Sequence, residues 1–295
     1  MPALLLALRP RQWTKNLVIF AGLAFSGGAS DSDTVSKAML AFALFCAASS
    51  AVYLFNDLLD RERDKQHPVK CKRPIASGKV SFQTAALTSA LLAGGALAIG
   101  FAFSSAANAI LAYLILQGAY SLRLKHVVIL DVFCIAAGFL LRVLCGVWAI
   151  DAPLSPWLVA CTVQLALFLA LCKRRAEVVA IGDGSVAQRP LLREYEGVGT
   201  DVMVGVAASA LLVTYTLYTL LPGALLQMDV AIESRAGEPG MIWTVPMVLY
   251  GVMRYLYLVY NQEKGERPER ILTNDMPLAL SILAYCAVVG WVVYF

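Results

Sequence analysis

Three aspartates recur at helical spacing in the segment that runs from Asn56 to Asp64 with the order Asn-Asp-Leu-Leu-Asp-Arg-Glu-Arg-Asp. Residues three, four and seven positions apart lie on one face of a helix, so Asp57, Asp60 and Asp64 would project their carboxylates to the same side. Mg²⁺ prefers a few hard carboxylate oxygens and takes its other ligands from water and substrate phosphates. The spacing therefore predicts that these three aspartates are catalytic residues that bind magnesium with a diphosphate substrate.

Basic residues follow these acids directly, at Lys70, Lys72 and Arg73. A metal–phosphate complex needs acids for the metal and cations for the phosphate, and the two kinds stand next to each other here. The plainer interpretation is that the acids are solvated just beyond a membrane helix and are neutralised by the basic residues between them. Their helical register, together with the cations that follow, favours the metal–phosphate interpretation.

A second charged segment, Cys172-Lys173-Arg174-Arg175-Ala176-Glu177, follows a later apolar run. In a helix, Lys173 and Arg174 lie four and three positions before Glu177, which is the spacing of side-chain ion pairs. One interpretation is an interfacial basic run with such a stabilising pair. The functional interpretation is a second half-site, in which Glu177 assists the metal while Lys173 and Arg174 bind substrate phosphate.

Composition indicates which elements must position these residues. The chain is 59% hydrophobic and 15% charged with a mean hydropathy of +0.70, against about 25% charged residues in soluble domains. We therefore expect an all-α integral membrane bundle of about nine transmembrane helices, or eight if the short first run is interfacial or re-entrant. The apolar runs cover residues 17–29, 36–58, 83–104, 106–122, 128–149, 155–172, 202–224, 240–260 and 276–295.

With nine crossings, nearly all Lys and Arg residues outside the helices fall on one face of the membrane, here called the near face. The far loops hold Lys37, Arg235 and several acids, and the near face holds Arg9, Arg11, Lys15, residues 61–79, Arg123, Lys125, residues 173–175, Arg189, Arg193, Lys264, Arg267 and Arg270. Because basic loops stay in the cytoplasm, we expect a multi-pass protein of the inner (cell) membrane whose active site faces the cytoplasm. No nucleic-acid motif accompanies the cations, so nucleic acid is not an expected partner. No cleavable signal peptide is expected either.

Several polar residues at cytoplasmic helix ends are candidates for holding phosphate oxygens, namely Lys15, Asn16, Tyr120 and Lys125. Arg142 is a further candidate because it falls inside an apolar run, where a charge is costly unless it is paired or faces a wet cavity. Arg254 shares this property. The seven cysteines and two histidines form no metal-binding or catalytic pattern.

The segment from Asn56 to Asp64 has the form NDxxDxxxD, and residues 73–78 have the form RPxAxG. In both motifs the chain resembles the UbiA superfamily of membrane prenyltransferases. The resemblance extends over essentially the whole chain, and it implies a single domain over residues 1–295 with nine helices around a central cavity open to the cytoplasmic face. Asn56 and Arg73, as members of these motifs, are further candidate substrate-binding residues.

Aromatic prenyltransferases of this superfamily usually carry a second motif, DxxxD, after the sixth helix, where this chain has Lys173-Arg-Arg-Ala-Glu177. With residues 8–16, 120–126 and 265–269, this change resembles the decaprenyl-phosphate phosphoribosyltransferase branch. That branch implies Mg²⁺-dependent transfer of a 5-phosphoribosyl group from phosphoribosyl diphosphate to a polyprenyl phosphate, in cell envelope biosynthesis. Such a donor and acceptor carry more phosphate than a prenyl diphosphate with an aromatic acid, so additional cations suit them.

Two alternatives stay open at this point. An aromatic prenyltransferase that uses a prenyl diphosphate donor has the same fold, although the missing DxxxD argues against it. A non-enzymatic transporter or lipid-binding membrane protein would suit the many helices, but transporters place charged sites near mid-membrane rather than on one face. The sequence is compatible with an oligomer.

Overall fold

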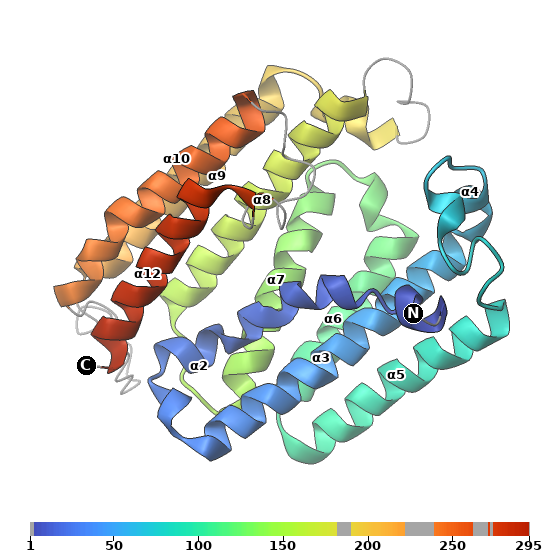
Figure 1. Ribbon diagram of the computed structural model, residues 1–295, viewed down its shortest axis with the longest axis horizontal. Helices are drawn as coiled ribbons and strands as arrows, with labels where there is room; N and C mark the ends of the chain where they lie inside the picture. Colours follow the sequence, from blue (N-terminus) through green and yellow to red (C-terminus); the bar gives the residue numbers. More distant parts are fainter. Residues whose placement is uncertain (1–2, 182–189, 222–238, 262–270, 272–273, 295) are drawn as a thin grey trace. The chain divides into compact units, whose positions relative to one another are not determined.

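The computed structural model describes residues 3–181, 190–221, 239–261, 271 and 274–294 of the 295 residues (Figure 1). Regular secondary structure in these residues is helical throughout, so the predicted all-α class is confirmed. Seven of the helices are long and apolar enough to cross a membrane. They are α3 Ser32–Leu59, α5 Phe82–Phe103, α7 Leu130–Ala149, α8 Pro156–Ile181, α9 Val198–Leu220, α12 Met276–Tyr294, and α10 Val245–Asn261 together with the preceding 3₁₀ turn η8 Pro239–Thr244. The last span runs over Gly240–Asn261, because the 17 residues of α10 alone are too few.

An eighth apolar helix, α6 Ala106–Leu122, has 17 residues, which gives a length of about 25 Å against the roughly 30 Å of a bilayer core. The first apolar run, residues 17–29, is not one helix. The 3₁₀ helix η1 Pro10–Phe20 leads into α2 Ala21–Phe25, and a second 3₁₀ turn, η2 Gly28–Ser30, follows. Gly27 separates the last two with φ 72°, a left-handed conformation that ends a right-handed helix. The count of nine crossings is therefore not confirmed.

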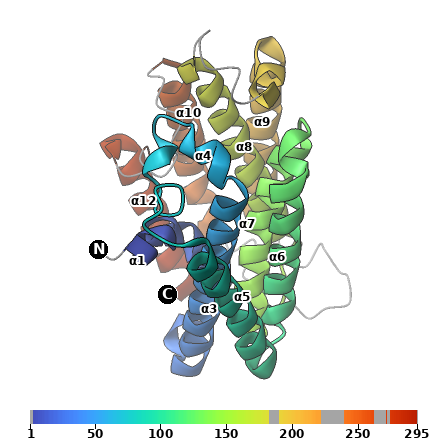
Figure 2. The ribbon, with the colours of Figure 1, turned by 90° about the vertical axis from the view of Figure 1, so that its right-hand side faces the viewer.

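The chain divides into two compact units, and unit 1 comprises residues 1–24, 28–123 and 141–152. Within it α5 runs alongside α3, as Figure 2 shows, and α6 packs against both helices. Ile19 from η1, Phe45 from α3 and Ile110 from α6 are among the side chains that fill its core. The short helices α1 Ala3–Ala7 and α4 Arg61–Lys65 lie close to α3.

A glycine sets the path of η1 across unit 1. A Cβ atom added to Gly146 of α7 would lie 1.9 Å from the carbonyl oxygen of Ile19. The backbone of η1 therefore packs directly against α7, which the missing side chain alone permits. This contact brings Asn16 of η1 toward the part of α7 that carries Arg142.

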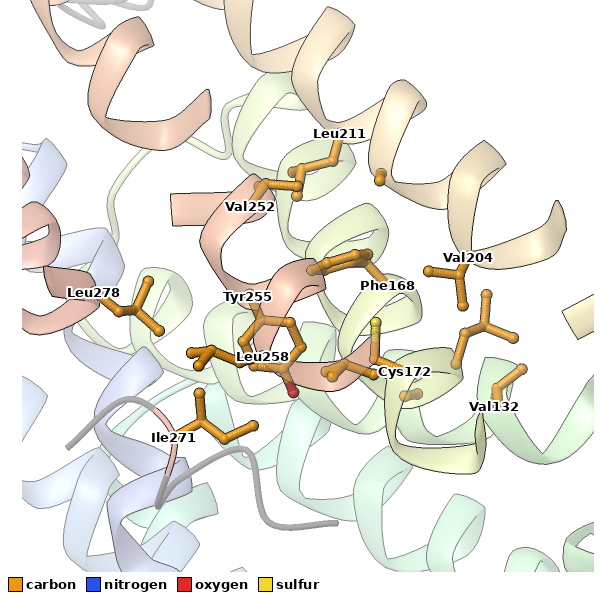
Figure 3. Close-up of a cluster of buried hydrophobic side chains, with 14 of the residues drawn as sticks. Val132, Phe168, Cys172, Val204, Leu211, Val252, Tyr255, Leu258, Ile271 and Leu278 are labelled. Carbon is orange, nitrogen blue, oxygen red and sulfur yellow. The ribbon is translucent and has the colours of Figure 1, made fainter. Parts of the chain in front are cut away.

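Unit 2 comprises residues 25–27, 124–140 and 153–295. Its core joins α8, α9, α10 and α12, and Figure 3 shows Phe168 and Cys172 of α8 among the side chains that fill it. The ring of Phe168 meets that of Tyr255 on α10 edge to face, with centroids 5.6 Å apart. These contacts place α8 against α9 and α10, and Lys173, Arg174 and Glu177 follow Cys172 on the same helix. The expectation of a single domain over residues 1–295 stays a prediction.

Candidate active site

The aspartate-rich segment spans a junction between two helices rather than one continuous helix. Helix α3 ends at Leu59, Asp60 stands between the helices with φ −90° and ψ 5°, and α4 begins at Arg61. Hydrogen bonds from the amide of Asp60 to Asn56 and from the amide of Asp64 to Asp60 still keep the backbone coiled across the junction. Asp57 and Asp64 are both buried, at 3% and 2% exposure, while Asp60 is partly exposed.

Asp57 and Asp64 converge on Arg73. Nη1 of Arg73 lies 3.0 Å from Oδ1 of Asp57 and 2.6 Å from Oδ2 of Asp64. A second guanidinium group contacts the same oxygen of Asp57. Nη2 of Arg9 lies 2.5 Å from this Oδ1. Asp60 has a different contact, with Nη1 of Arg63 at 3.9 Å. The structure thus brings two of the three predicted aspartates together.

Local structure explains how both arginines reach the aspartates. The loop after Arg73 is a tight turn, in which Ser77 donates to the carbonyl of Arg73 and Gly78 adopts φ 78°. Ile75 anchors this loop, because it is 1% exposed and packs with Leu54 of α3. Arg9 itself has a left-handed backbone, with φ 54°, and its guanidinium group lies 5.0 Å from the ring centroid of Tyr53.

Arg9 was not among the residues that the sequence predicted for the site. It lies 48 positions from Asp57, and local spacing cannot reveal a pair that is so distant in the chain. Its place beside Pro10 in the basic N-terminal arm was the available signal.

The donor set of unit 1 fits a divalent cation. Among the residues that the structure describes, no group of three or more His, Cys, Asp and Glu side chains is gathered as a metal site. Asp57 and Asp64 nevertheless direct carboxylate oxygens to one point, which Nη1 of Arg73 occupies. A cation in its place would meet two hard oxygens, and Mg²⁺ commonly takes its remaining ligands from water and phosphate.

Arg142 and Asn16 form a buried polar cluster in unit 1. Arg142 is 6% exposed, and its Nε donates to Oδ1 of Asn16 at 2.8 Å while its Nη2 donates to the hydroxyl of Tyr113 at 3.1 Å. Its guanidinium group also lies 4.8 Å from the centroid of the Tyr113 ring and 5.2 Å from that of Phe45. Two residues predicted as substrate-binding, 126 positions apart, are therefore in direct contact.

A second charged cluster, in unit 2, is built around Arg174. Its Nε donates to Oδ2 of Asp131 at 2.8 Å, and its Nη1 donates to Oε2 of Glu177 at 2.6 Å. Nζ of Lys173 is 3.8 Å from the other oxygen of Glu177. The ion pairs expected from the helical spacing of this segment are thus present, and Asp131 is an additional member.

Tyr195 completes this cluster. Its hydroxyl donates to Oδ1 of Asp131 and accepts a hydrogen bond of 2.8 Å from the amide of Ile129. Burial, with the bond to Asp131 as the next cause, raises the pKa of Tyr195, so that its hydroxyl stays protonated and serves as a donor. Asp131 was not among the residues that the sequence predicted for the site, although an acid inside the apolar run 128–149 is a signal of function.

The other predicted residues lie on several different elements. Lys15 on η1, Asn56 on α3, Tyr120 on α6 and Lys125 in the 3₁₀ turn η4 Leu124–His126 are all partly exposed. Arg254, the other intramembrane arginine, forms a two-pronged ion pair with Asp275, with distances of 3.1 and 2.9 Å. Arg189, Lys264, Arg267, Arg270 and residues 265–269 lie outside the described residues.

Comparisons with known proteins agree with this architecture. The sequence model of the UbiA prenyltransferase family matches residues 16–280. Decaprenyl-phosphate phosphoribosyltransferase of Mycolicibacterium smegmatis is 32% identical over 99% of this chain and 92% of its own length. The protein of the same name from Mycobacterium tuberculosis is 34% identical over 98% of this chain and 93% of its length.

A solved structure gives the fold independently. The UbiA homolog from Archaeoglobus fulgidus, bound to DMAPP and Mg²⁺, superposes with a TM-score of 0.70 and covers 99% of this chain and 98% of its own, at 20% identity. At that identity the likeness shows the fold alone.

Proposed function

The chain belongs to the UbiA prenyltransferase family, and we propose that within this family it transfers a 5-phosphoribosyl group from phosphoribosyl diphosphate to a polyprenyl phosphate of the decaprenyl type, with Mg²⁺ as cofactor. It is a transferase and an integral multi-pass membrane protein. The observation that carries the proposal is the nearly full-length similarity to relatives named decaprenyl-phosphate phosphoribosyltransferase. The buried charges of both units support it.

The diphosphate of the donor would bind at the aspartates of unit 1. Asp57, Asp64 and the adjacent Asp60 would hold Mg²⁺, which supplies charge neutralisation for a departing diphosphate. Arg73 and Arg9 already lie within hydrogen-bond distance of Asp57. With a cation bound by the aspartates, these guanidinium groups would be donors for phosphate oxygens, which accept strong charge-assisted hydrogen bonds.

The remaining phosphates of donor and acceptor need further cations and polar donors. Lys173 suits this role because its amino group is only loosely paired, 3.8 Å from Glu177. Arg142 brings a buried positive charge whose contacts include two neutral oxygens. We assign to the same role Lys15, Asn16, Asn56, Tyr120 and Lys125, and we assign to Glu177 a supporting part in catalysis.

The transfer itself forms one bond and breaks one. An oxygen of the lipid phosphate attacks the anomeric carbon of the ribose, and the bond from that carbon to the diphosphate oxygen breaks as positive charge develops on the sugar. A phosphate monoester is ionised near neutral pH, so the attacking oxygen needs no general base. The polyprenyl tail would stay in the membrane, and the site would open to the cytoplasm, where the basic loops are expected.

A reconstituted assay tests this proposal. Purified protein in nanodiscs would be incubated with labelled phosphoribosyl diphosphate and a polyprenyl phosphate, with Mg²⁺ or with excess EDTA. We expect a lipid-linked ribose phosphate and released diphosphate with Mg²⁺ only. Absence of that product from folded protein would refute the proposal, and product formation from a prenyl diphosphate and an aromatic acid would instead support an aromatic prenyltransferase.

A further inference from the structure

The cluster around Arg174 has a buried end and a more exposed end. Three of its residues are buried, with exposed fractions of 0% for Asp131, 1% for Tyr195 and 7% for Arg174. The side chains of Glu177 and Lys173 follow, at 16% and 38%. Substrate can therefore reach the cluster at the end formed by Glu177 and Lys173, while the other three members lie within the protein.

We propose that Asp131 and Tyr195 are positioning residues that fix Arg174, and through it the carboxylate of Glu177. Arg174 then acts within the protein instead of as a ligand for substrate phosphate. The inference rests on the proposed function, because it gives Glu177 its part in the transfer. It adds Asp131 and Tyr195 to the residues on which the reaction depends.

The geometry of the guanidinium group supports this role. The group is planar and rigid, and Arg174 uses Nε for Asp131 and Nη1 for Glu177, at 2.8 and 2.6 Å. Two carboxylates bound at different nitrogens leave little freedom for rotation. Arg174 compensates the charge of Asp131, which is 0% exposed, so giving up this ion pair for a phosphate would be costly.

Backbone strain at Ile129 points to the same cluster. Ile129 has φ 67°, a conformation that β-branched residues rarely adopt and that costs about 1–3 kcal/mol. In this conformation its amide donates to the hydroxyl of Tyr195, which in turn donates to Asp131. The strained residue thus fixes the tyrosine that fixes the aspartate.

The next residue on α8 provides a matched control. Nε of Arg175 lies 2.7 Å from Oδ1 of Asp201, and the hydroxyl of Tyr260 lies 2.8 Å from the same oxygen. This second trio has the same three residue types and ties α8 to α9 and α10, but Asp201 is 41% exposed. It stabilises helix packing, so its loss measures the effect of a purely structural Arg–Asp–Tyr trio.

A double-mutant cycle tests the proposal. Asp131→Asn and Tyr195→Phe would each be made in the native enzyme and in Glu177→Gln, with Asp201→Asn as the control. In the native background we expect kcat to fall about 10- to 100-fold, since small misplacements of reacting groups have effects of this size. In the Glu177→Gln background the same changes should lower kcat less than about threefold further, because the positioned group is already lost. Asp201→Asn should leave kcat within about threefold.

Arg174→Lys separates positioning from phosphate binding. We expect it to lower kcat while the KM for each substrate stays within about threefold, since a positioning residue does not touch substrate. A KM for phosphoribosyl diphosphate raised about tenfold or more, at unchanged kcat, would overturn the proposal. Equal losses from Asp131→Asn in both backgrounds would overturn it as well.

The test also separates this inference from the proposed function. If the enzyme uses a prenyl diphosphate instead of phosphoribosyl diphosphate, the proposed function is wrong. The inference is then still tested, because kcat of the same variants can be measured for prenyl transfer. An enzyme that is inactive with both donors would overturn both. If Asp131→Asn does not fold, Tyr195→Phe decides the outcome, because it removes a single hydroxyl group.

Discussion

Arg73 joins Asp57 and Asp64 through one nitrogen atom, its Nη1, which lies 3.0 Å from the first carboxylate and 2.6 Å from the second. The arginine therefore stands where a divalent cation would bind. If both compete for the same oxygens, metal and diphosphate should bind cooperatively, because the diphosphate gives the displaced arginine a new partner.

Arg73→Gln should change two metal affinities in opposite directions, the affinity for metal alone and the affinity for metal in the presence of diphosphate. Without the competing guanidinium, Mn²⁺ alone should bind about tenfold more tightly, or about 1.4 kcal/mol. Binding of Mn²⁺ in the presence of inorganic pyrophosphate should weaken. Electron paramagnetic resonance of free Mn²⁺ measures both affinities. Lys37→Gln is the control, because Lys37 is 48% exposed and pairs with Asp33 near the start of α3. Weaker Mn²⁺ binding by Arg73→Gln in both conditions would contradict the exchange.

Asp57→Asn and Asp60→Asn should abolish turnover while the protein stays folded. We expect activity to fall on the order of 100-fold or more in each, since an amide is a poor ligand for a hard cation. Asp57→Asn should also lower the free energy of unfolding by about 1–3 kcal/mol, because it weakens buried charge-assisted hydrogen bonds.

The control for these variants is Asp33→Asn, whose side chain is 68% exposed and pairs with Lys37. It should leave activity unchanged. Retained activity in both Asp57→Asn and Asp60→Asn, measured in the nanodisc assay, would remove the metal assignment.

Gly146→Ala should displace η1 from α7. The added Cβ would lie 1.9 Å from the carbonyl oxygen of Ile19, so the backbone has to move, at a cost of about 1–3 kcal/mol or more. Thermal unfolding would show a lower Tm. Gly118→Ala is the matched control, because a Cβ atom at this position of α6 meets no atom within 4 Å, and it should stabilise the helix by about 0.5–1 kcal/mol. Equal Tm values for the two variants would contradict the packing of η1 on α7.

Tyr195 should make the protein less stable at alkaline pH. Its pKa is raised in the folded state, whereas an unfolded tyrosine ionises near pH 10. Above that pH the unfolded state binds fewer protons than the folded state, so the free energy of unfolding falls as the pH rises. Denaturant titrations between pH 8 and 11 should show a shallower decrease for Tyr195→Phe than for the native protein. The same slope in both would contradict the buried donor.

Local patterns in the sequence predicted the helical membrane segments, because a run of about 20 apolar residues is a sufficient signal for a spanning helix. Helical spacing also predicted the pairing of Glu177 with Lys173 and Arg174, which the structure confirms. It placed Asp57 and Asp64 on one side, and the structure joins them through Arg73. Asp60 departs from this pattern because it lies at the junction of α3 and α4.

Local patterns in the sequence could not predict contacts between distant parts of the chain. Asn16 meets Arg142 across 126 positions, and Tyr195 meets Asp131 across 64. Both pairs depend on how helices pack, which periodicity does not encode. The first apolar run was expected to be a single segment, and its division follows from the left-handed residue Gly27 and the 3₁₀ conformation before it.

The 3₁₀ conformation of η1 changes how far its 11 residues reach. At about 2.0 Å per residue it extends roughly 22 Å, where an α-helix of the same length would extend about 16 Å. Long 3₁₀ segments are uncommon. An α-helix would need about 15 residues for the same reach, so the 3₁₀ form lets a shorter stretch of chain lead from Pro10 to the contact of Ile19 with Gly146.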